Sequence, residues 1–456
     1  MSDQQQPITA ALADFCRGIR YEDLPPDAIT VAKQCLLDWL AVTIAGADQP
    51  LTQILRAEAL EQGGNPQATL IGSGERVTAS QAALVNGAAS HALDYDDVHL
   101  AMSGHPSVPI WPALIALAEQ RGASGRDVLA AFVAGVEMEC RIGLYVMPGH
   151  YSTGFHATGT LGTFGAAAAC AHLMGLDRNQ WLNALGIAGA QAAGLKSMFG
   201  TMCKPLHAGK AAQNGLAAAT LAARGFTSNP EVLETHQGFA ATQTTTPNPE
   251  AALSGLGDRY AVRDVLFKYH AACYGTHETI EAILRLKEQN AVVAGDVERI
   301  LLTVPRGHLS MCNIQEPSTP LEGKFSLRFT AALALVTGDA SEQAFTPAAV
   351  REPALTSVRD RVTVESRTGS ADWDGTRVSL ALSDGRRLEE SVDLNIPASD
   401  LDVQWERLTT KFASLAANRL ATDAVDAVRQ SIRDFDRLNI ADLVALAAPS
   451  RTALVR

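Results

Sequence analysis

Apolar positions in the first two-thirds of the chain recur every three to four residues, which is the spacing of one face of an α-helix. Residues 25–46 show this pattern with its end signals, since prolines open the stretch and Gly46 closes it. Ile29, Leu36 and Leu40 fall on one face between those ends. Alanine and glycine occupy many such faces and let helices approach closely, so we predict a compact helical bundle. The same pattern covers residues 108–122, 123–146 and 179–194.

The pattern changes after about residue 265, where short runs rich in valine, leucine, isoleucine and threonine indicate strands. Two stretches between them, residues 276–290 and 324–338, keep helical spacing. Ser383, Asp384 and Gly385 are typical of a hairpin turn between the last two strands. The strands are predicted at residues 296–305, 361–367, 376–384 and 387–394.

Helical spacing returns from about Leu401 to the end of the chain. We therefore predict a mostly α fold with two parts. Residues 1–268 form a large all-helical domain, and residues 269–398 form a smaller α+β lid domain. Residues 399–456 are expected to be helices that return to the helical domain.

Charge and composition narrow the classes of function. The 456 residues include 37 Lys and Arg against 49 Asp and Glu, a formal charge of −12. This balance argues against a nucleic-acid surface, but a local cluster of cations could still bind a small anion. No basic region with a long apolar run opens the chain, and glycines and a histidine interrupt its most apolar stretch, residues 159–175. Seven scattered cysteines without a CxxC pair are typical of reduced thiols. We expect a cytoplasmic protein without membrane or nucleic-acid partners.

Four basic residues stand at the predicted starts of helices: His105, His156, Lys204 and His277. The start of a helix offers unpaired N–H groups and a partial positive charge, so an anion placed there gains from both the dipole and a nearby cation. If the four helix starts converge, they form a pocket for a polycarboxylate or a phosphate. For each residue taken singly, we favour the simpler interpretation that it is a solvated loop residue.

Other polar residues near these stretches have plainer explanations. His207 and Lys210 lie inside the helix that follows Lys204, and we interpret them as structural or surface residues. Asp94, Asp96 and Asp97 could ligate Mg²⁺. Because no second acidic cluster and no phosphate-binding motif accompanies them, we favour an acid/base or structural role. We expect neither a metal nor a cofactor.

Five ordered blocks together resemble the MmgE/PrpD family, whose members include 2-methylcitrate dehydratases, cis-aconitate decarboxylases and iminodisuccinate epimerases. The resemblance spans roughly Ile8 to Asp436. It implies a metal-independent enzyme, usually a homodimer, with a site between a helical domain and an α+β lid. The blocks are "ASHALDYDDVH…GHPS", "GFHATGTLGTFGAAAA", "KPLHAGKAAQNGLAAATLAARGFT", "FKYHAACYGTHETIEA" and "EGKFSLRFTAALAL".

The resemblance also implies which residues act. In decarboxylase members a threonine belongs to the functional set, and it falls on Val98 here, which argues against decarboxylation of cis-aconitate. In epimerase members a tyrosine and a lysine are the two proposed catalytic bases, and Tyr151 and Lys204 stand at the matching places. The remaining functional positions of decarboxylase members match Asp94, His105, His156, Lys204 and His277 in this sequence.

These reactions share proton chemistry at a carbon next to a carboxylate, where a base and a cationic environment stabilise a carbanion. We expect a lyase that dehydrates a hydroxy-di- or tricarboxylate. The alternatives are a dicarboxylate epimerase, a cis-aconitate decarboxylase-like enzyme and a non-catalytic carboxylate-binding protein.

Each residue then receives an expected role. His105 and His156 transfer protons, since an unperturbed imidazole titrates near neutral pH. Asp94 orients one of these histidines. Lys204 acts as a base or as a carboxylate clamp, and Tyr151 serves as a second base if the enzyme is an epimerase. His277 and Lys324 are expected to bind the substrate from the lid.

Overall fold

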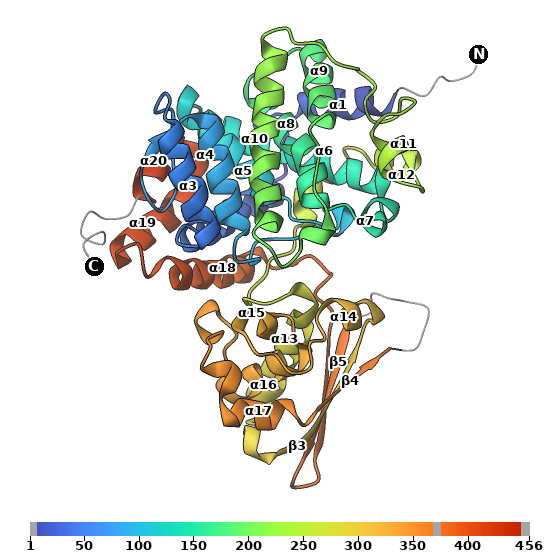
Figure 1. The fold of residues 1–456 in the computed structure, drawn as a ribbon, viewed down its shortest axis with the longest axis vertical. Coiled ribbons are helices and arrows are strands. Elements are labelled where there is room, and N and C mark those ends of the chain that lie inside the picture. The colour runs from blue at the N-terminus through green and yellow to red at the C-terminus, as the bar shows by residue number, and fades with distance from the viewer. Residues whose placement is uncertain (1–6, 368–374, 448–456) are drawn as a thin grey trace. The chain divides into compact units, whose positions relative to one another are not determined.

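The computed structural model describes residues 7–367 and 375–447 and shows a mostly helical chain with one small sheet of four strands (Figure 1). This confirms the predicted fold class. Backbone proximity divides the chain into two compact units, residues 1–267 with 398–456 and residues 268–397. The outermost residues of the predicted ranges, 1–6 and 448–456, lie outside the described part.

Five packed helices form the centre of the helical unit (Figure 1). Helix α10 contacts both α8 and α4 along its length, and small residues make this possible. At Gly209 of α10, an added Cβ would lie 2.3 Å from the carbonyl oxygen of Leu84 on α4, so only glycine fits. The five helices are α4 (Ala79–His91), α5 (Ser107–Arg121), α6 (Gly125–Val146), α8 (Ala157–Leu173) and α10 (Cys203–Ala223).

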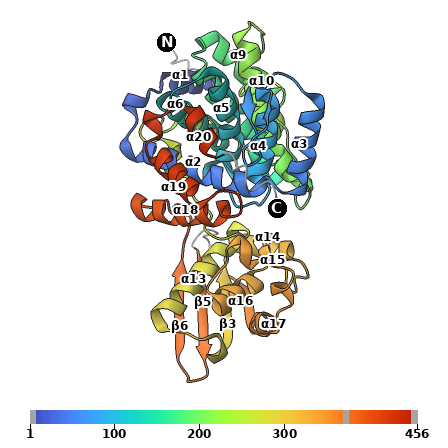
Figure 2. The ribbon, with the colours of Figure 1, turned by 90° about the vertical axis from the view of Figure 1, so that its left-hand side faces the viewer.

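The C-terminal helices pack against the first part of the chain, as Figure 2 shows for α18 (Leu401–Ala416) and α2 (Pro26–Gly46). Helix α2 is long and apolar enough to cross a membrane by composition, but 78% of its most apolar stretch is buried in the protein. It is therefore best described as a core helix. Two further C-terminal helices are α19 (Thr422–Arg433) and α20 (Ile440–Leu446).

One predicted helix is shorter than its sequence pattern suggested. Helix α9 (Arg178–Gly189) stops well before residue 194. The residues beyond it are not helical: Gly194 has a φ of +155°, and its carbonyl accepts a hydrogen bond from the His156 N–H. The remaining elements of this unit are α1 (Ile8–Gly18), α3 (Pro50–Gln62), α7 (Gly149–Thr153), α11 (Phe239–Gln243), α12 (Pro249–Leu253) and the strands β1 (Ala68–Thr69) and β2 (Arg76–Val77).

The α+β unit has a sheet in the order β4-β3-β5-β6, with helices α13 and α16 packed against its strands. Strands β3 and β4 are parallel, whereas β3, β5 and β6 are antiparallel neighbours. The hairpin turn predicted at Ser383–Gly385 joins β5 to β6, and Gly385 adopts a positive φ. The elements are β3 (Val297–Val304), β4 (Val362–Ser366), β5 (Thr376–Leu382), β6 (Arg387–Val392), α13 (Tyr274–Asn290), α14 (Arg306–Met311), α15 (Pro320–Lys324), α16 (Leu327–Thr337) and α17 (Pro353–Arg359).

Candidate active site

The segment between α4 and α5 carries the densest group of ionisable side chains in the helical unit. Helix α4 ends at His91, and α5 begins just after His105 and Pro106. Asp94 lies between them with a φ of +51°, in the left-handed region that costs a non-glycine residue conformational energy. Aspartate is one of the few non-glycine residues that adopt this conformation readily, and such positions are often found at functional sites.

Asp96 holds two histidines at once. Its carboxylate is fully buried and lies 2.9 Å from Nδ1 of His91 and 3.0 Å from Nδ1 of His105. Nδ1 of His105 also lies 2.9 Å from the backbone oxygen of Asp97. With acceptors on this side of both rings, each ring donates from Nδ1, and Nε2 remains the basic nitrogen of the neutral imidazole. Asp96 therefore orients the histidines, a role that the sequence had suggested for Asp94.

Asp94 instead forms an ion pair with Lys204. Its Oδ2 lies 2.7 Å from the Lys204 ammonium, and its Oδ1 lies 3.8 Å from Nε2 of His105, too far for a hydrogen bond. Lys204 is in the first turn of α10, with 15% of its side chain exposed. The ammonium also lies 5.3 Å from the centre of the Phe199 ring. This arrangement puts the Lys204 ammonium and Nε2 of His105 around the same Asp94 carboxylate, which suits the binding of a substrate carboxylate next to a histidine.

His156 completes the cluster from the start of α8. It is the N-cap residue of that helix and is almost fully buried. Its ring stacks on His91 with centroids 5.8 Å apart, and its Nδ1 lies 3.0 Å from Nδ1 of His207. The backbone N–H of His105 donates to Oγ1 of Thr158, in the first turn of the same helix. The starts of α5, α8 and α10 therefore converge, as predicted for three of the four helices.

Burial and nearby positive charge favour the neutral forms of His91 and His156. Burial lowers the pKa of His91 to about 4, and the nearby Lys204 charge contributes in the same direction. Burial, followed by the charges of His91 and Lys204, also holds the pKa of His156 well below its usual value. Burial alone would raise the pKa of Asp96, but the adjoining His105 and His91 hold that pKa well below the usual range. At neutral pH the cluster thus combines an ionised Asp96 with neutral His91 and His156 rings.

The cluster also has the composition of a possible cation site. One ligand atom from each of His91, Asp94, Asp96 and His105 lies within 4.8 Å of all the others. In this structure, however, the Lys204 ammonium is already paired with Asp94, and both ring Nδ1 atoms hydrogen-bond to Asp96. Positive charge is therefore supplied by the chain itself. The Asp97 carboxylate, also considered as a ligand, instead accepts hydrogen bonds from Ser107.

Tyr151 lies on the short helix α7 of the same unit. The Lys196 ammonium is 3.6 Å from the centre of the Tyr151 ring and donates to the Tyr151 backbone oxygen at 3.2 Å. Burial lowers the pKa of Lys196. The tyrosine proposed as an epimerase base thus has a lysine neighbour, but this neighbour is Lys196, which the sequence did not single out.

The two predicted substrate-binding residues of the α+β unit lie near the start of α13. His277 is buried in the first turn, where its Nε2 lies 3.1 Å from the backbone oxygen of Ala272. The carbonyl of Lys324 accepts a hydrogen bond from the Cys273 N–H, while its ammonium pairs with Glu342 at 2.6 Å. His277 and the backbone of Lys324 therefore both lie at the start of α13 in the α+β unit.

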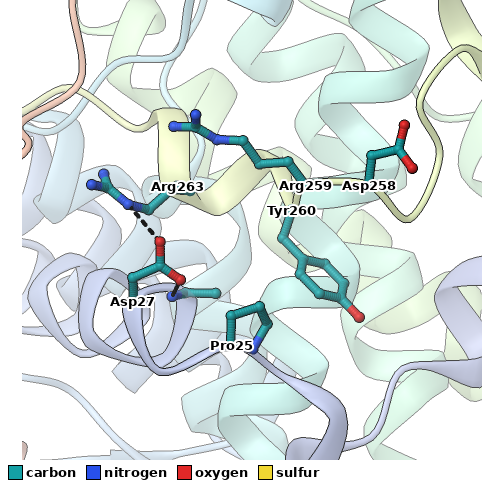
Figure 3. A pocket seen from close by; sticks show the side chains of 7 residues that line it. Pro25, Asp27, Asp258, Arg259, Tyr260 and Arg263 are labelled. Atoms are coloured by element: carbon teal, nitrogen blue, oxygen red, sulfur yellow. Dashed lines mark hydrogen bonds and ion pairs between the residues drawn. The ribbon is translucent and has the colours of Figure 1, made fainter.

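A surface cavity of about 320 Å³ lies elsewhere in the helical unit, and Figure 3 shows its lining. Its two arginines are paired with acids: Arg263 with Asp27 at 3.0 Å and Arg259 with Asp264 at 2.5 Å. The seven residues that line it include neither a histidine nor a lysine. The histidine cluster, rather than this cavity, contains groups suited to proton transfer.

Three members of the cluster were not identified as site residues from the sequence: His91, Asp96 and His207. His207 was interpreted as structural or surface, yet its ring contacts His156. The sequence does contain a signal for His207. Residues three apart on a helix share a face, so His207 lies on the same side of α10 as Lys204. Only tertiary structure could show that Asp96, rather than Asp94, contacts Nδ1 of both rings.

Family comparison agrees with this architecture. The MmgE/PrpD N-terminal domain matches residues 10–252, and the MmgE/PrpD C-terminal domain matches residues 270–437. The human cis-aconitate decarboxylase is 27% identical over 94% of this chain and 92% of its own length. The cis-aconitate decarboxylase of Aspergillus terreus is 27% identical over 100% of this chain and 99% of its own. The 2-methylcitrate dehydratase of Escherichia coli K12 is 23% identical over 82% of each chain.

The two matched domains cover more than half of the chain and follow the order of the helical and α+β parts. The named relatives are lyases, since decarboxylases and dehydratases both release a small molecule from a carboxylic acid. The chain therefore belongs to the MmgE/PrpD family.

Proposed function

We propose that this protein is a lyase that forms a carbanion next to a carboxylate of a di- or tricarboxylate. The observation that carries the proposal is the Lys204–Asp94 ion pair beside His105. An incoming carboxylate can replace Asp94 as the partner of Lys204, which places the substrate carbon near neutral imidazoles. A nearby cation and helix N–H groups then stabilise the developing negative charge.

The roles of the residues follow from their contacts. Lys204 and the start of α10 hold a substrate carboxylate. Asp96 accepts a hydrogen bond from Nδ1 of His105, which leaves Nε2 as the nitrogen through which this ring accepts a proton. His156, neutral and almost fully buried, carries one ring proton that it can give to carbon or to a leaving hydroxide. His277 and Lys324 are proposed to bind the distal part of the substrate.

Decarboxylation is the first candidate for the overall reaction, because the named decarboxylases are similar over more than nine-tenths of the chain. In that reaction the carboxylate leaves as CO₂, its electron pair stays on carbon, and a histidine proton then adds to that carbon. Dehydration is the second candidate. It stays a candidate because Val98 stands where the family resemblance expects a threonine in decarboxylases. The Val98 backbone is fixed by two hydrogen bonds to Leu266.

A substrate panel in heavy water separates these outcomes. The purified protein is mixed with cis-aconitate, 2-methylcitrate or iminodisuccinate and followed by NMR and ultraviolet absorbance. A decarboxylase releases CO₂ from cis-aconitate and puts deuterium on carbon, whereas a dehydratase creates an absorbing alkene from 2-methylcitrate. An epimerase would exchange deuterium into iminodisuccinate without new absorbance. Binding without any turnover would refute the lyase proposal in favour of a carboxylate-binding protein.

The same assay tests the proposed independence from metals. Because Lys204 supplies the positive charge at Asp94, we expect full activity after dialysis against EDTA. Loss of activity that returns on addition of Mg²⁺ or iron would instead assign His91, Asp94, Asp96 and His105 to a metal ion.

A further inference from the structure

The contact between His156 and His207 imposes a condition on their protons. Their Nδ1 atoms are 3.0 Å apart, which is a hydrogen-bond distance. Two bare nitrogens would repel each other, and two N–H groups would clash, so one ring must donate and the other must accept. In the neutral pair, one histidine therefore carries its proton on Nδ1 and the other carries it on Nε2.

The two rings differ in their access to solvent. His156 is almost fully buried at the start of α8, with its ring between His91 and Phe199. His207 is only half-buried, one turn after Lys204 on α10. The pair therefore extends from the interior of the cluster toward the outside. The charged and titratable groups closest to it are His91, Lys204 and His105.

We infer that His207 is the proton-exchange partner of His156 and resupplies the proton that His156 gives to the substrate. This inference rests on the proposed carbanion chemistry. His156 donates from Nε2 to the substrate carbon or leaving hydroxide, and its Nδ1 takes the proton of the His207 Nδ1–H. His207 then regains one proton at Nε2 from water or buffer, which leaves the pair in the opposite tautomers. After product release, water in the emptied site protonates His156 at Nε2, the Nδ1 proton returns to His207, and His207 releases its Nε2 proton to solvent. The starting tautomers are thereby restored, and each turnover takes up one proton from solvent in total. His207 does not touch the substrate and is a positioning residue.

The shared proton can be tested without a substrate. In protein labelled with ¹⁵N-histidine, the inference predicts a downfield N–H proton coupled to one Nδ1, and two opposite tautomers for His156 and His207. His207→Ala should remove that proton, while His236→Ala, a change at an exposed histidine of the same unit, should keep it. The same tautomer on both rings, with no shared proton, would overturn the inference even if the enzyme proves active.

The kinetic test uses whichever substrate the panel identifies. His207→Ala should lower kcat about a hundredfold, in line with the loss of an acid/base group, and leave KM within about twofold of the wild type. Added imidazole should restore the rate in proportion to its concentration, because it replaces the missing ring. His207→Gln, which keeps the bulk of the side chain, should be slow as well, and His236→Ala should match the wild type.

The possible results separate the relay from the proposed function. Near-full activity of His207→Ala, or a loss that imidazole does not restore, would overturn the relay. A structural role would lower the melting temperature without giving imidazole dependence. If the wild type turns over none of the substrates, the proposed function fails, and the NMR result still decides whether the two histidines share a proton.

Discussion

Two lysine–aspartate ion pairs contact adjacent residues, Asp94 and Tyr95, in the segment after α4. They differ in how much of their side chains is exposed to solvent. Lys411 of α18 bonds to Asp38 of α2 and to the backbone oxygen of Tyr95, both at 2.6 Å. Its side chain is 3% exposed, and that of Asp38 is 0% exposed. Lys204 bonds to Asp94, the residue before Tyr95, but these side chains are 15% and 28% exposed.

The difference separates a structural pair from a chemical one. The Lys411 ammonium lies among fixed protein acceptors and joins the two ends of the helical unit, so an incoming anion has no way to reach it. Lys204 is in a first helical turn, beside a strained aspartate and neutral histidines. The same two residue types therefore support the fold in one place and are available to a substrate in the other.

The largest effect should come from breaking the closed pair. Lys411→Met leaves the Asp38 carboxylate buried without its cation, and breaking such a pair typically costs about 3–5 kcal/mol. Urea titration should show that loss in the free energy of unfolding. The kcat of the molecules that remain folded should be close to that of the wild type. A stable Lys411→Met variant with abolished turnover would reverse the assignment of the two pairs.

Breaking the open pair should act on chemistry instead. Lys204→Met should lower kcat/KM about a hundredfold or more, as expected for the loss of a positioned charge and acid/base group. Its melting temperature should change little, because Asp94 is partly solvated. Lys210→Met, on the same helix but at an exposed position, is the matched control and should keep normal activity. Near-normal turnover by Lys204→Met would remove the basis of the proposed site.

Asp96→Asn should have a smaller effect because it acts through the histidines. Asparagine replaces one carboxylate oxygen with an NH₂ group, which cannot accept a hydrogen bond from a ring N–H. His91 or His105 must therefore change tautomer or move. Losing one charge-assisted hydrogen bond corresponds to about 1.5 kcal/mol, or roughly tenfold in kcat. The shift should also appear in the ¹⁵N spectrum of His105. Unchanged histidine tautomers would show that Asp96 does not orient the rings.

Asp97→Asn should have the smallest effect, visible only as a dependence on pH. Burial, followed by the nearby Asp38 charge, raises the pKa of Asp97 to about 8, against 3.8 for an ordinary aspartate side chain. Between these values the folded state binds more protons than the unfolded state, so this group makes the wild type less stable as pH rises from about 4 to 8. Asparagine does not titrate, and the variant should therefore gain stability relative to the wild type over that range. Parallel stability curves would contradict the raised pKa.

The sequence predicted the framework of this site better than its contacts. Spacing of apolar residues and helix-start signals placed His105, His156 and Lys204 at helix starts, and the structure brings those three starts together. The pairing of Asp96 with two rings, and that of His207 with His156, could not be predicted. Those contacts join residues from different helices, and local pattern carries no information on which atoms meet across a tertiary interface.

The central claim is that Lys204, and not the cavity at Arg259 and Arg263, receives the carboxylate of the substrate. A crystal structure with propane-1,2,3-tricarboxylate, an unreactive tricarboxylate, tests this most directly. We predict a carboxylate within hydrogen-bonding distance of the Lys204 ammonium, with Asp94 displaced from its present 2.7 Å contact. A tricarboxylate bound only between Arg259 and Arg263, with the Lys204–Asp94 pair intact, would contradict the account.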